Sequence, residues 1–267
     1  MTPPVIMRKL SCLFFLSLLL SVFNIQAAEE NNDKIVQQLL HQAATARDAF
    51  DDNKALSLYQ LVLTKDSNNL DAIFNIGIII QRKGWIAEET SKDLALDYYR
   101  QAKLYADKAY RLYPNSFEAN LSMAGTIGRL AKYGSAKERV QAAWDIKKYA
   151  DAAYRLKPTE PHLVHLLAWW NFELSKPTWF ERSMASMLFG GLPKDADVQR
   201  GVQLMLYLVR INPNYIVYGY DLARFYEYLG EKTKAVESLK RVIALTPHAP
   251  EEFYYLKSAR DFLNKLQ

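Results

Sequence analysis

Two histidines are the nearest thing in this chain to a metal-binding motif. His162 and His165 lie three residues apart, so a helix would place both on one face, with Glu160 and Glu173 not far away. Two imidazoles at this spacing can share a zinc ion, but a protein site normally supplies three or four ligands. No further ligand is assured here, so we predict no metal site. We expect the two residues to be polar groups in a groove or to pack against Trp169.

The sequence carries none of the short motifs that mark common catalytic sites. It has no G-x-S-x-G nucleophile motif, no phosphate-binding loop and no paired His-Glu helix motif. Its single cysteine is Cys12, so the chain beyond residue 27 has no thiol for a disulfide or a metal. We therefore predict that the protein is not an enzyme, with no catalytic residues and no cofactor.

Arginine and aromatic residues recur at equivalent positions of successive segments. Together they would form a groove with apolar walls and a cationic interior, suited to a peptide with a carboxylate or to an amphiphile with an anionic head group. Taken singly, each is better explained by a paired surface charge or by packing between helices, and the set as a whole carries the prediction. The candidate groove residues are Phe74, Arg82, Arg129, His165, Trp169, Phe172, Tyr220 and Arg224.

The helices that must position these residues follow one register. Five units can be aligned so that a turn residue closes each unit and a small residue falls eight places into each first helix. The closing residues are Ser67, Pro114, Pro158, Pro213 and Pro247, and the small residues are Ala43, Gly77, Ala124, Ala168 and Ala223. This is the register of the tetratricopeptide repeat, two antiparallel helices in about 34 residues. We therefore predict an all-α fold, a tetratricopeptide-like helical solenoid of about five helix pairs with insertions.

The repeat domain is predicted to run from residue 28 to residue 267 as one unit. Its middle repeats are too long by roughly 10 to 21 residues, and the largest addition, at 175–195, is mostly apolar. Residues 251–266 are predicted to form a C-terminal capping helix whose inward side chains are Phe253, Leu256, Phe262 and Leu266.

The insertion at 175–195 has a candidate apolar face. Trp179, Phe180, Met184 and Met187 can lie together on one side of a helix that Gly190 and Gly191 would end. Three interpretations remain open: a lid over the groove, a contact with a partner or a membrane, and an extra core helix that joins two units.

Residues 1–27 have the pattern of a cleaved signal peptide. Arg8 and Lys9 precede an apolar stretch at 10–25, and cleavage before Ala28 would leave an acidic start. We therefore predict a periplasmic or secreted protein. The alternative is that the segment stays in place and anchors the protein to a membrane.

The charge balance argues against nucleic acid as the main partner. The chain has 34 Lys and Arg against 29 Asp and Glu, a formal net charge of +5. Nucleic-acid binding usually requires a concentrated basic face. We expect an unidentified protein or peptide partner, with an anionic amphiphile as the alternative ligand and membrane contact left open.

Three longer motifs carry a family resemblance. They are K-E-R-V-Q-A-A-W-D-I-K-K-Y-A-D-A-A-Y-R-L-K-P at 137–158, H-L-L-A-W-W-N-F-E-L at 165–174 and W-F-E-R-S-M-A-S-M-L-F-G-G-L-P at 179–193. In these motifs the chain resembles the regulator of microtubule dynamics family. The resemblance implies an all-helical tetratricopeptide-like domain, often behind an N-terminal hydrophobic segment, with no established catalytic residues. An exported chain would meet no microtubule, so that activity is not carried over.

These observations favour a non-catalytic exported tetratricopeptide-repeat scaffold that mediates protein–protein interaction in an extracytoplasmic complex. One alternative is binding or carriage of a lipid-like ligand in the concave groove. The other is a membrane-tethered scaffold that retains its N-terminal helix.

Overall fold

The computed structural model describes residues 30–267, apart from the side chains of Trp179, Phe180 and Pro250. The predicted signal peptide at 1–27 lies outside the described residues. Every regular element from residue 30 onward is a helix, as the repeat register predicts. No helix in this described part is both long enough and apolar enough to span a bilayer.

The chain divides into two compact units, residues 1–72 and residues 73–267. In the first unit, a helix at 30–48 is followed by α2 (Asp52–Lys65). Asp51 begins α2, because its carboxylate accepts the backbone N–H of Lys54 at 3.1 Å. Ala43, Ala55 and Val62 are fully buried, so the small-residue register holds here too.

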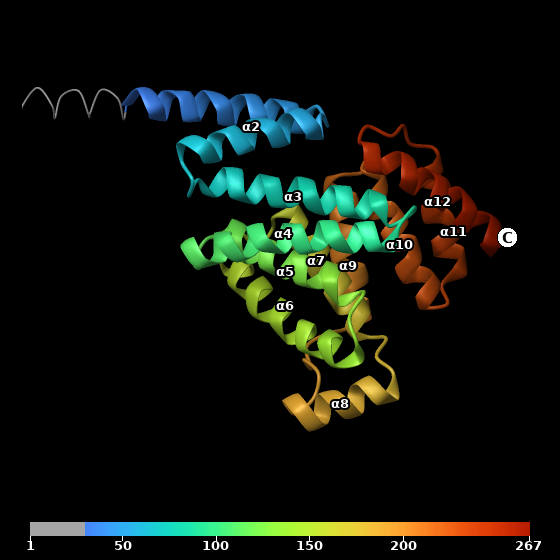
Figure 1. The fold of residues 1–267 in the computed structure, drawn as a ribbon. Coiled ribbons are helices and arrows are strands. Elements are labelled where there is room, and N and C mark those ends of the chain that lie inside the picture. The colour runs from blue at the N-terminus through green and yellow to red at the C-terminus, as the bar shows by residue number, and fades with distance from the viewer. Residues whose placement is uncertain (1–29) are drawn as a thin grey trace, which may run out of the picture. The chain divides into compact units, whose positions relative to one another are not determined.

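The second unit consists of successive antiparallel helix pairs (Figure 1). The pairs are α3 (Leu70–Ala87) with α4 (Lys92–Leu112), α5 (Phe117–Ala131) with α6 (Ala136–Leu156), α7 (Pro161–Leu174) with α9 (Val198–Ile211), and α10 (Ile216–Tyr228) with α11 (Lys232–Ile243). Between α7 and α9 lies α8 (Trp179–Phe189), and α12 (Pro250–Leu266) ends the chain. The repeat-based prediction of a tetratricopeptide-like solenoid is confirmed.

Helix boundaries follow from local chemistry. Ser91, Ser116 and Ser135 each cap the N-terminus of the next helix by accepting a backbone N–H. In two of the middle repeats the extra residues lengthen the second helices, since α4 and α6 each have 21 residues, whereas the largest addition contains α8. Prolines follow the second helices closely, as in Pro114 two residues after α4 and Pro158 two residues after α6.

The small residues of the register lie where helices cross. Ala124, Ala168 and Ala223 are fully buried, and a Cβ on Gly77 would come within 3.6 Å of the Tyr105 side chain on α4. On α10, Gly219 is tighter still, because a Cβ there would lie 2.6 Å from Val242 on α11. Small side chains therefore allow the close packing that the repeat requires.

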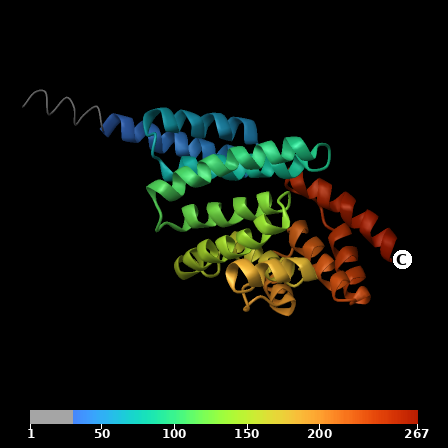
Figure 2. The same ribbon diagram turned by 60° about the horizontal axis from the view of Figure 1, so that its bottom comes forward.

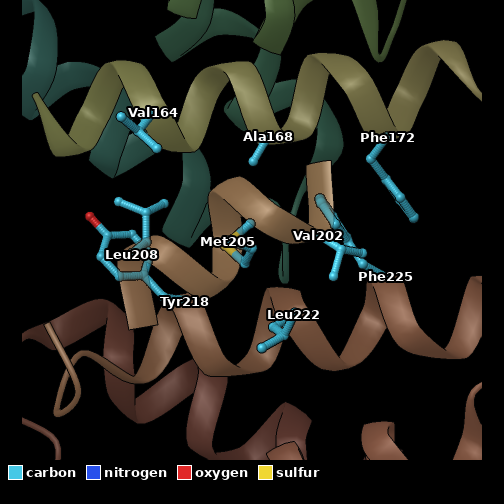
Figure 3. Close-up of a cluster of buried hydrophobic side chains, with 9 residues drawn as sticks. All are labelled: Val164, Ala168, Phe172, Val202, Met205, Leu208, Tyr218, Leu222 and Phe225. Carbon is cyan, nitrogen blue, oxygen red and sulfur yellow. The ribbon is translucent and has the colours of Figure 1, made fainter. Parts of the chain in front are cut away.

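The core around α7, α9 and α10 shows how first and second helices interlock (Figure 3). Phe172 of α7 stacks on Phe225 of α10, with ring centroids 4.0 Å apart. Met205 and Leu208 of α9 belong to the same cluster and are fully buried. This core holds the exposed sides of α7 and α10 in a defined relation to each other.

The C-terminal helix α12 caps the last helix pair, but its buried side differs from the predicted one. It packs on α10 and α11, and Leu256 is buried as expected. The prediction that Phe253 points inward is wrong, because 63% of Phe253 is exposed. Glu252 and Tyr255 take the buried side instead. Glu252 accepts the backbone N–H groups of His248 and Ala249 and, at 2.9 Å, that of Ile216 at the start of α10.

Candidate functional site

Side chains of the first helices α3 and α5, and of α7 and α10, contact each other, and α12 packs on α10. Figure 2 shows α12, in red, beside the end of the α3–α4 pair. Tyr255 of α12 packs edge-on against Trp85 of α3, with ring centroids 4.8 Å apart. It also contacts Tyr220 of α10 at 5.1 Å, and Tyr220 in turn packs on Phe262. We call this set of side chains the inner surface, made of Trp85, Arg129, His165, Trp169, Tyr220, Asp221 and Arg224.

Two arginine–tryptophan pairs connect neighbouring first helices on the inner surface. The guanidinium of Arg129 on α5 lies 5.1 Å from the ring centroid of Trp85 on α3. The guanidinium of Arg224 on α10 lies 4.6 Å from the ring centroid of Trp169 on α7. Each cation–π pair contributes about 0.5–1 kcal/mol where it is exposed, and each holds a cation at a defined place.

A buried carboxylate positions the second arginine–tryptophan pair, Arg224 and Trp169. Asp221 of α10 is 3% exposed, and its Oδ2 lies 2.8 Å from His165 Nε2 and accepts the Trp169 indole N–H at 2.9 Å. Its Oδ1 has no hydrogen-bond partner among the described residues, although Arg224 Nη1 stands 3.9 Å away. Asp221 therefore fixes the orientation of His165 and Trp169, and through Trp169 it supports Arg224.

Burial and nearby charges raise the pKa values of two tyrosines in this region. Burial, with the charges of Glu160 and Asp221, raises the pKa of Tyr218 to about 12. Burial also raises the pKa of Tyr255 well above its ordinary value, and the Asp221 charge adds to the effect while Arg129 and Arg224 oppose it. Both side chains stay neutral at physiological pH and act as apolar rings with a hydroxyl group.

An open groove of about 480 Å³ lies between α7, α10 and α12. Its walls combine apolar rings with charged groups: Phe172, Tyr220, Tyr228 and Phe262 with Lys176, Arg224, Glu227, Asp261 and Lys265. Lys176 lies 4.2 Å from the Phe172 ring centroid and 2.6 Å from Glu173. The groove can therefore bind an apolar side chain and place a carboxylate beside the Arg224 guanidinium.

A family model described as Regulator of microtubule dynamics protein 1-3 matches residues 39–267. The chain belongs to this family. The resemblance carried by the sequence motifs is thereby confirmed.

Members of the regulator of microtubule dynamics family from animals are similar over much of the chain. Regulator of microtubule dynamics protein 3 of Rattus norvegicus is 27% identical over 217 residues, which cover 78% of this chain and 45% of that protein. Regulator of microtubule dynamics protein 1 of Caenorhabditis elegans is 27% identical over 161 residues, which cover 60% of this chain and 71% of that protein. The match thus spans less than half the length of the rat protein.

A solved structure supports the fold of this family member. The crystal structure of a thermophilic TPR protein in Thermus thermophilus superposes with a TM-score of 0.57 and 13% sequence identity. The alignment covers 84% of this chain and 98% of that one. At this identity the likeness establishes the helical repeat architecture alone.

The structure brings together five of the eight candidate groove residues predicted from the sequence. Arg129, His165, Trp169, Tyr220 and Arg224 all lie on the inner surface.

The remaining candidates are placed mainly by packing. Phe74 is half-buried against the core of α5, α6 and α7. Phe172 is 4% exposed and belongs to the core, yet its ring also lines the open groove. Arg82 is half-buried on α3. His162 and His165 bind different partners, since His162 Nδ1 lies 2.9 Å from Glu160.

The insertion lies against a second helix, and its interpretation as a lid, a contact or a core helix stays a prediction. α8 packs on α6, the second helix of its pair, where Arg139 forms an ion pair with Glu181 at 2.6 Å. Trp144 donates its indole N–H to the Gly191 carbonyl at 3.1 Å, and Lys147 lies 2.7 Å from Asp195. These long-range contacts hold both ends of the insertion against α6.

The structure describes the side chains of two of the four insertion residues singled out from the sequence. Met184 is half-buried and Met187 is 83% exposed, whereas the side chains of Trp179 and Phe180 lie outside the described residues. Ala185 is the fully buried residue of α8. Gly190 and Gly191, with φ of 71° and 122°, end the helix in a conformation that favours glycine.

Two residues of the inner surface, Trp85 and Asp221, were missed by sequence reasoning, as was Tyr255 of α12, which packs on Trp85. Trp85 and Tyr255 were missed because α12 was expected only to cap the last pair. Asp221 carried a usable signal, since it is the one charged residue in the otherwise uncharged stretch at 216–223. A lone carboxylate in a buried helix segment usually has specific hydrogen-bond partners.

Proposed function

We propose that this protein is a non-catalytic, exported scaffold that binds a protein or peptide partner through the groove between α7, α10 and α12. The observation that carries the proposal is the position of Arg224. Its guanidinium lies over Trp169 and near Asp221, yet the side chain is 43% exposed and lines the open groove. A preorganised cation of this kind loses little entropy when it binds a ligand.

The chemistry of the groove favours a peptide that ends in a carboxylate. Arginine presents a planar fork that can bind both oxygens of a carboxylate at once. Lys176 and Lys265 add positive charge to the same groove, while the rings of Tyr228 and Phe262 can contact an apolar side chain next to the carboxylate. We propose a C-terminal segment whose last side chain is apolar.

Peptide binding tests the groove directly. An array of C-terminal peptides with apolar last residues is probed with the protein, and the strongest binder is labelled for fluorescence anisotropy. We expect the free-acid peptide to bind at least about ten-fold more tightly than its C-terminal amide, because a charge-assisted contact to Arg224 is lost. Arg224→Gln should weaken binding of the acid to the level of the amide.

Arg210 of α9 provides the matched control, because its guanidinium lies 5.6 Å from the Tyr207 ring outside the groove. Arg210→Gln should leave binding unchanged. Equal affinity for acid and amide peptides, or an Arg224→Gln variant that binds normally, would overturn the groove assignment.

Export is supported by the basic, apolar and small-residue pattern of residues 1–27. The full-length protein is expressed in a bacterial host, fractionated and sequenced from its N-terminus. A periplasmic protein that begins at Ala28 is the expected result. An intact N-terminus in the membrane fraction would contradict cleavage and favour the tethered alternative.

A further inference from the structure

The positive charge of the chain is concentrated in one part of the second unit. Residues 92–157, which run from α4 to α6, contain 13 Lys and Arg against 7 Asp and Glu. The whole chain has 34 Lys and Arg against 29 Asp and Glu, so the rest of the chain has 21 basic against 22 acidic residues. A local excess of this size creates a field that attracts anionic partners.

Two stripes of exposed cations account for much of this excess. On α4, Arg100, Leu104 and Arg111 are spaced so that they share one helical face, and all three are exposed. On α6, Lys148 and Arg155 are seven residues apart on one exposed face. Both helices are second helices of their pairs, so the stripes lie apart from the inner surface and its groove.

The two stripes are neighbours in space. Tyr110 of α4 packs edge-on against Tyr149 of α6, with ring centroids 5.0 Å apart. The Lys148 ammonium lies 4.8 Å from the Tyr149 centroid and 5.9 Å from that of Tyr110, so it stands at the junction of the two helices. We call the combined surface of Arg100, Leu104, Arg111, Lys148 and Arg155 the outer basic surface.

The cations of the outer basic surface lack ionic partners, whereas the nearby acids are already bound. Asp107 is paired with Lys103 at 2.5 Å, and Asp151 with Lys147 at 3.0 Å. Asp97 accepts a hydrogen bond from Gln101. Arg100, Arg111, Lys148 and Arg155 form no ion pair with any residue between 30 and 267. Their charge is therefore available to an external partner.

We propose that the outer basic surface docks on an anionic lipid bilayer. Leu104 favours a membrane over an acidic polypeptide, because it is 69% exposed and stands between Arg100 and Arg111 along the helix. Cations that attract anionic head groups, with an apolar side chain that enters the acyl boundary, are the chemistry of interfacial binding. Membrane docking here is independent of peptide binding on the inner surface.

Vesicle cosedimentation tests the docking surface. The probes are vesicles of phosphatidylcholine alone and of phosphatidylcholine with phosphatidylserine. We expect binding only to vesicles with phosphatidylserine, and its loss at high salt, since exposed charges are screened. Each basic residue near an anionic surface contributes about five-fold in affinity. The triple variant Arg111→Gln/Lys148→Gln/Arg155→Gln should therefore bind at least about ten-fold more weakly.

The matched control removes the same charge elsewhere. Lys232, Lys240 and Lys257 are exposed on α11 and α12, and the variant Lys232→Gln/Lys240→Gln/Lys257→Gln should bind nearly as the wild type does. Leu104→Asn tests the apolar contribution without any change of charge, and it should also weaken binding. Circular dichroism verifies that each variant is folded.

Three results would overturn the proposal. Wild-type protein that does not sediment with phosphatidylserine vesicles excludes docking on this lipid surface. Equal loss in the two triple variants would mean that net charge alone drives the association. Binding to polyglutamate without binding to vesicles would assign the surface to an acidic protein partner.

Discussion

At the scale of single residues, Asp221 connects α10 to two side chains of α7, His165 and Trp169. It is a buried carboxylate that receives the Trp169 indole N–H and lies within hydrogen-bond distance of His165. Burying a charge is costly unless it is paired and hydrogen-bonded. Here the cost is offset on one carboxylate oxygen by these two partners and on the other by the nearby Arg224. Asp221 is therefore a positioning residue for the aromatic base on which Arg224 lies.

Asp221→Ala should destabilise the second unit by about 1–3 kcal/mol, because the half-buried His165 ring loses its carboxylate partner and the Trp169 N–H keeps only the longer contact of 3.2 Å to His165 Nε2. Urea denaturation followed by tryptophan fluorescence measures the change. Glu227→Ala on the exposed side of the same helix is the control and should stay within about 0.5 kcal/mol of wild type. Equal effects of the two variants would show that Asp221 contributes no specific contact.

At the scale of helices, one carboxylate joins α3, α4 and α5. Glu88, just after the end of α3, accepts the Tyr99 hydroxyl at 2.8 Å, the Tyr133 hydroxyl at 3.2 Å and the Lys132 ammonium at 2.5 Å. Gly84 allows this approach, because a Cβ there would lie 2.7 Å from the Tyr99 ring. The turn between α3 and α4 is thus held by a polar network as well as by packing.

The Glu88 network predicts a specific dependence of stability on pH. Burial works to raise the pKa of Glu88, but hydrogen bonds from Lys132 and Tyr99 outweigh it and hold the pKa below the ordinary 4.5. A carboxylate with a lowered folded-state pKa stabilises the fold fully above its unfolded pKa. That stabilisation is lost as the pH falls through the folded-state value.

Glu88→Gln should therefore be less stable than wild type at neutral pH, and the difference should shrink between about pH 6 and about pH 3. Chemical denaturation at a series of pH values measures it. The other carboxylates are the same in both proteins, so their contribution to the pH dependence cancels in the difference between the two free energies of unfolding. Glu89→Gln, at the exposed next position, is the control and should track the wild type. A difference that is constant with pH would contradict this role for Glu88.

At the scale of the second unit, α12 converts an open array of helix pairs into a connected one. In a solenoid each repeat normally contacts only its neighbours. Here Tyr255 of the last helix packs on Trp85 of α3, and Glu252 ties the start of α12 to the start of α10. The contact joins helices that are far apart along the chain, so it should make unfolding of the unit more cooperative.

Tyr255→Ala should cost about 3–5 kcal/mol, because it removes a buried ring from between α3 and α10. Hydrogen exchange followed by mass spectrometry should show faster exchange in α10 and α12 than in α5 and α6, whereas in the wild type these helices should exchange together. Phe253→Ala, which truncates an exposed ring in the same helix, should change neither the free energy of unfolding nor the order of hydrogen exchange. Uniform loss of protection in Tyr255→Ala would show that α12 does not couple the pairs.

The sequence by itself determined the repeat register and the helices that follow from it. Ala124, Ala168 and Ala223 fall at helix crossings because residues on one face of a helix recur with a local period, and proline and serine mark the ends. The same register placed Arg129 and Arg224 on the inner surface. The register could not distinguish these two residues from Phe74, which packs against the core. Whether a residue on such a helix face is buried depends on which helix packs against it, and the register does not contain that information.

Only the tertiary structure decided what the inner surface contains. The docking of Tyr255 on Trp85 and the burial of Asp221 beside His165 depend on contacts between helices distant in sequence. The insertion likewise lies on α6 because Arg139 and Lys147 bind its two ends. Local periodicity carries no information about such pairings, since their geometry follows from how the helix pairs stack and where the last helix returns.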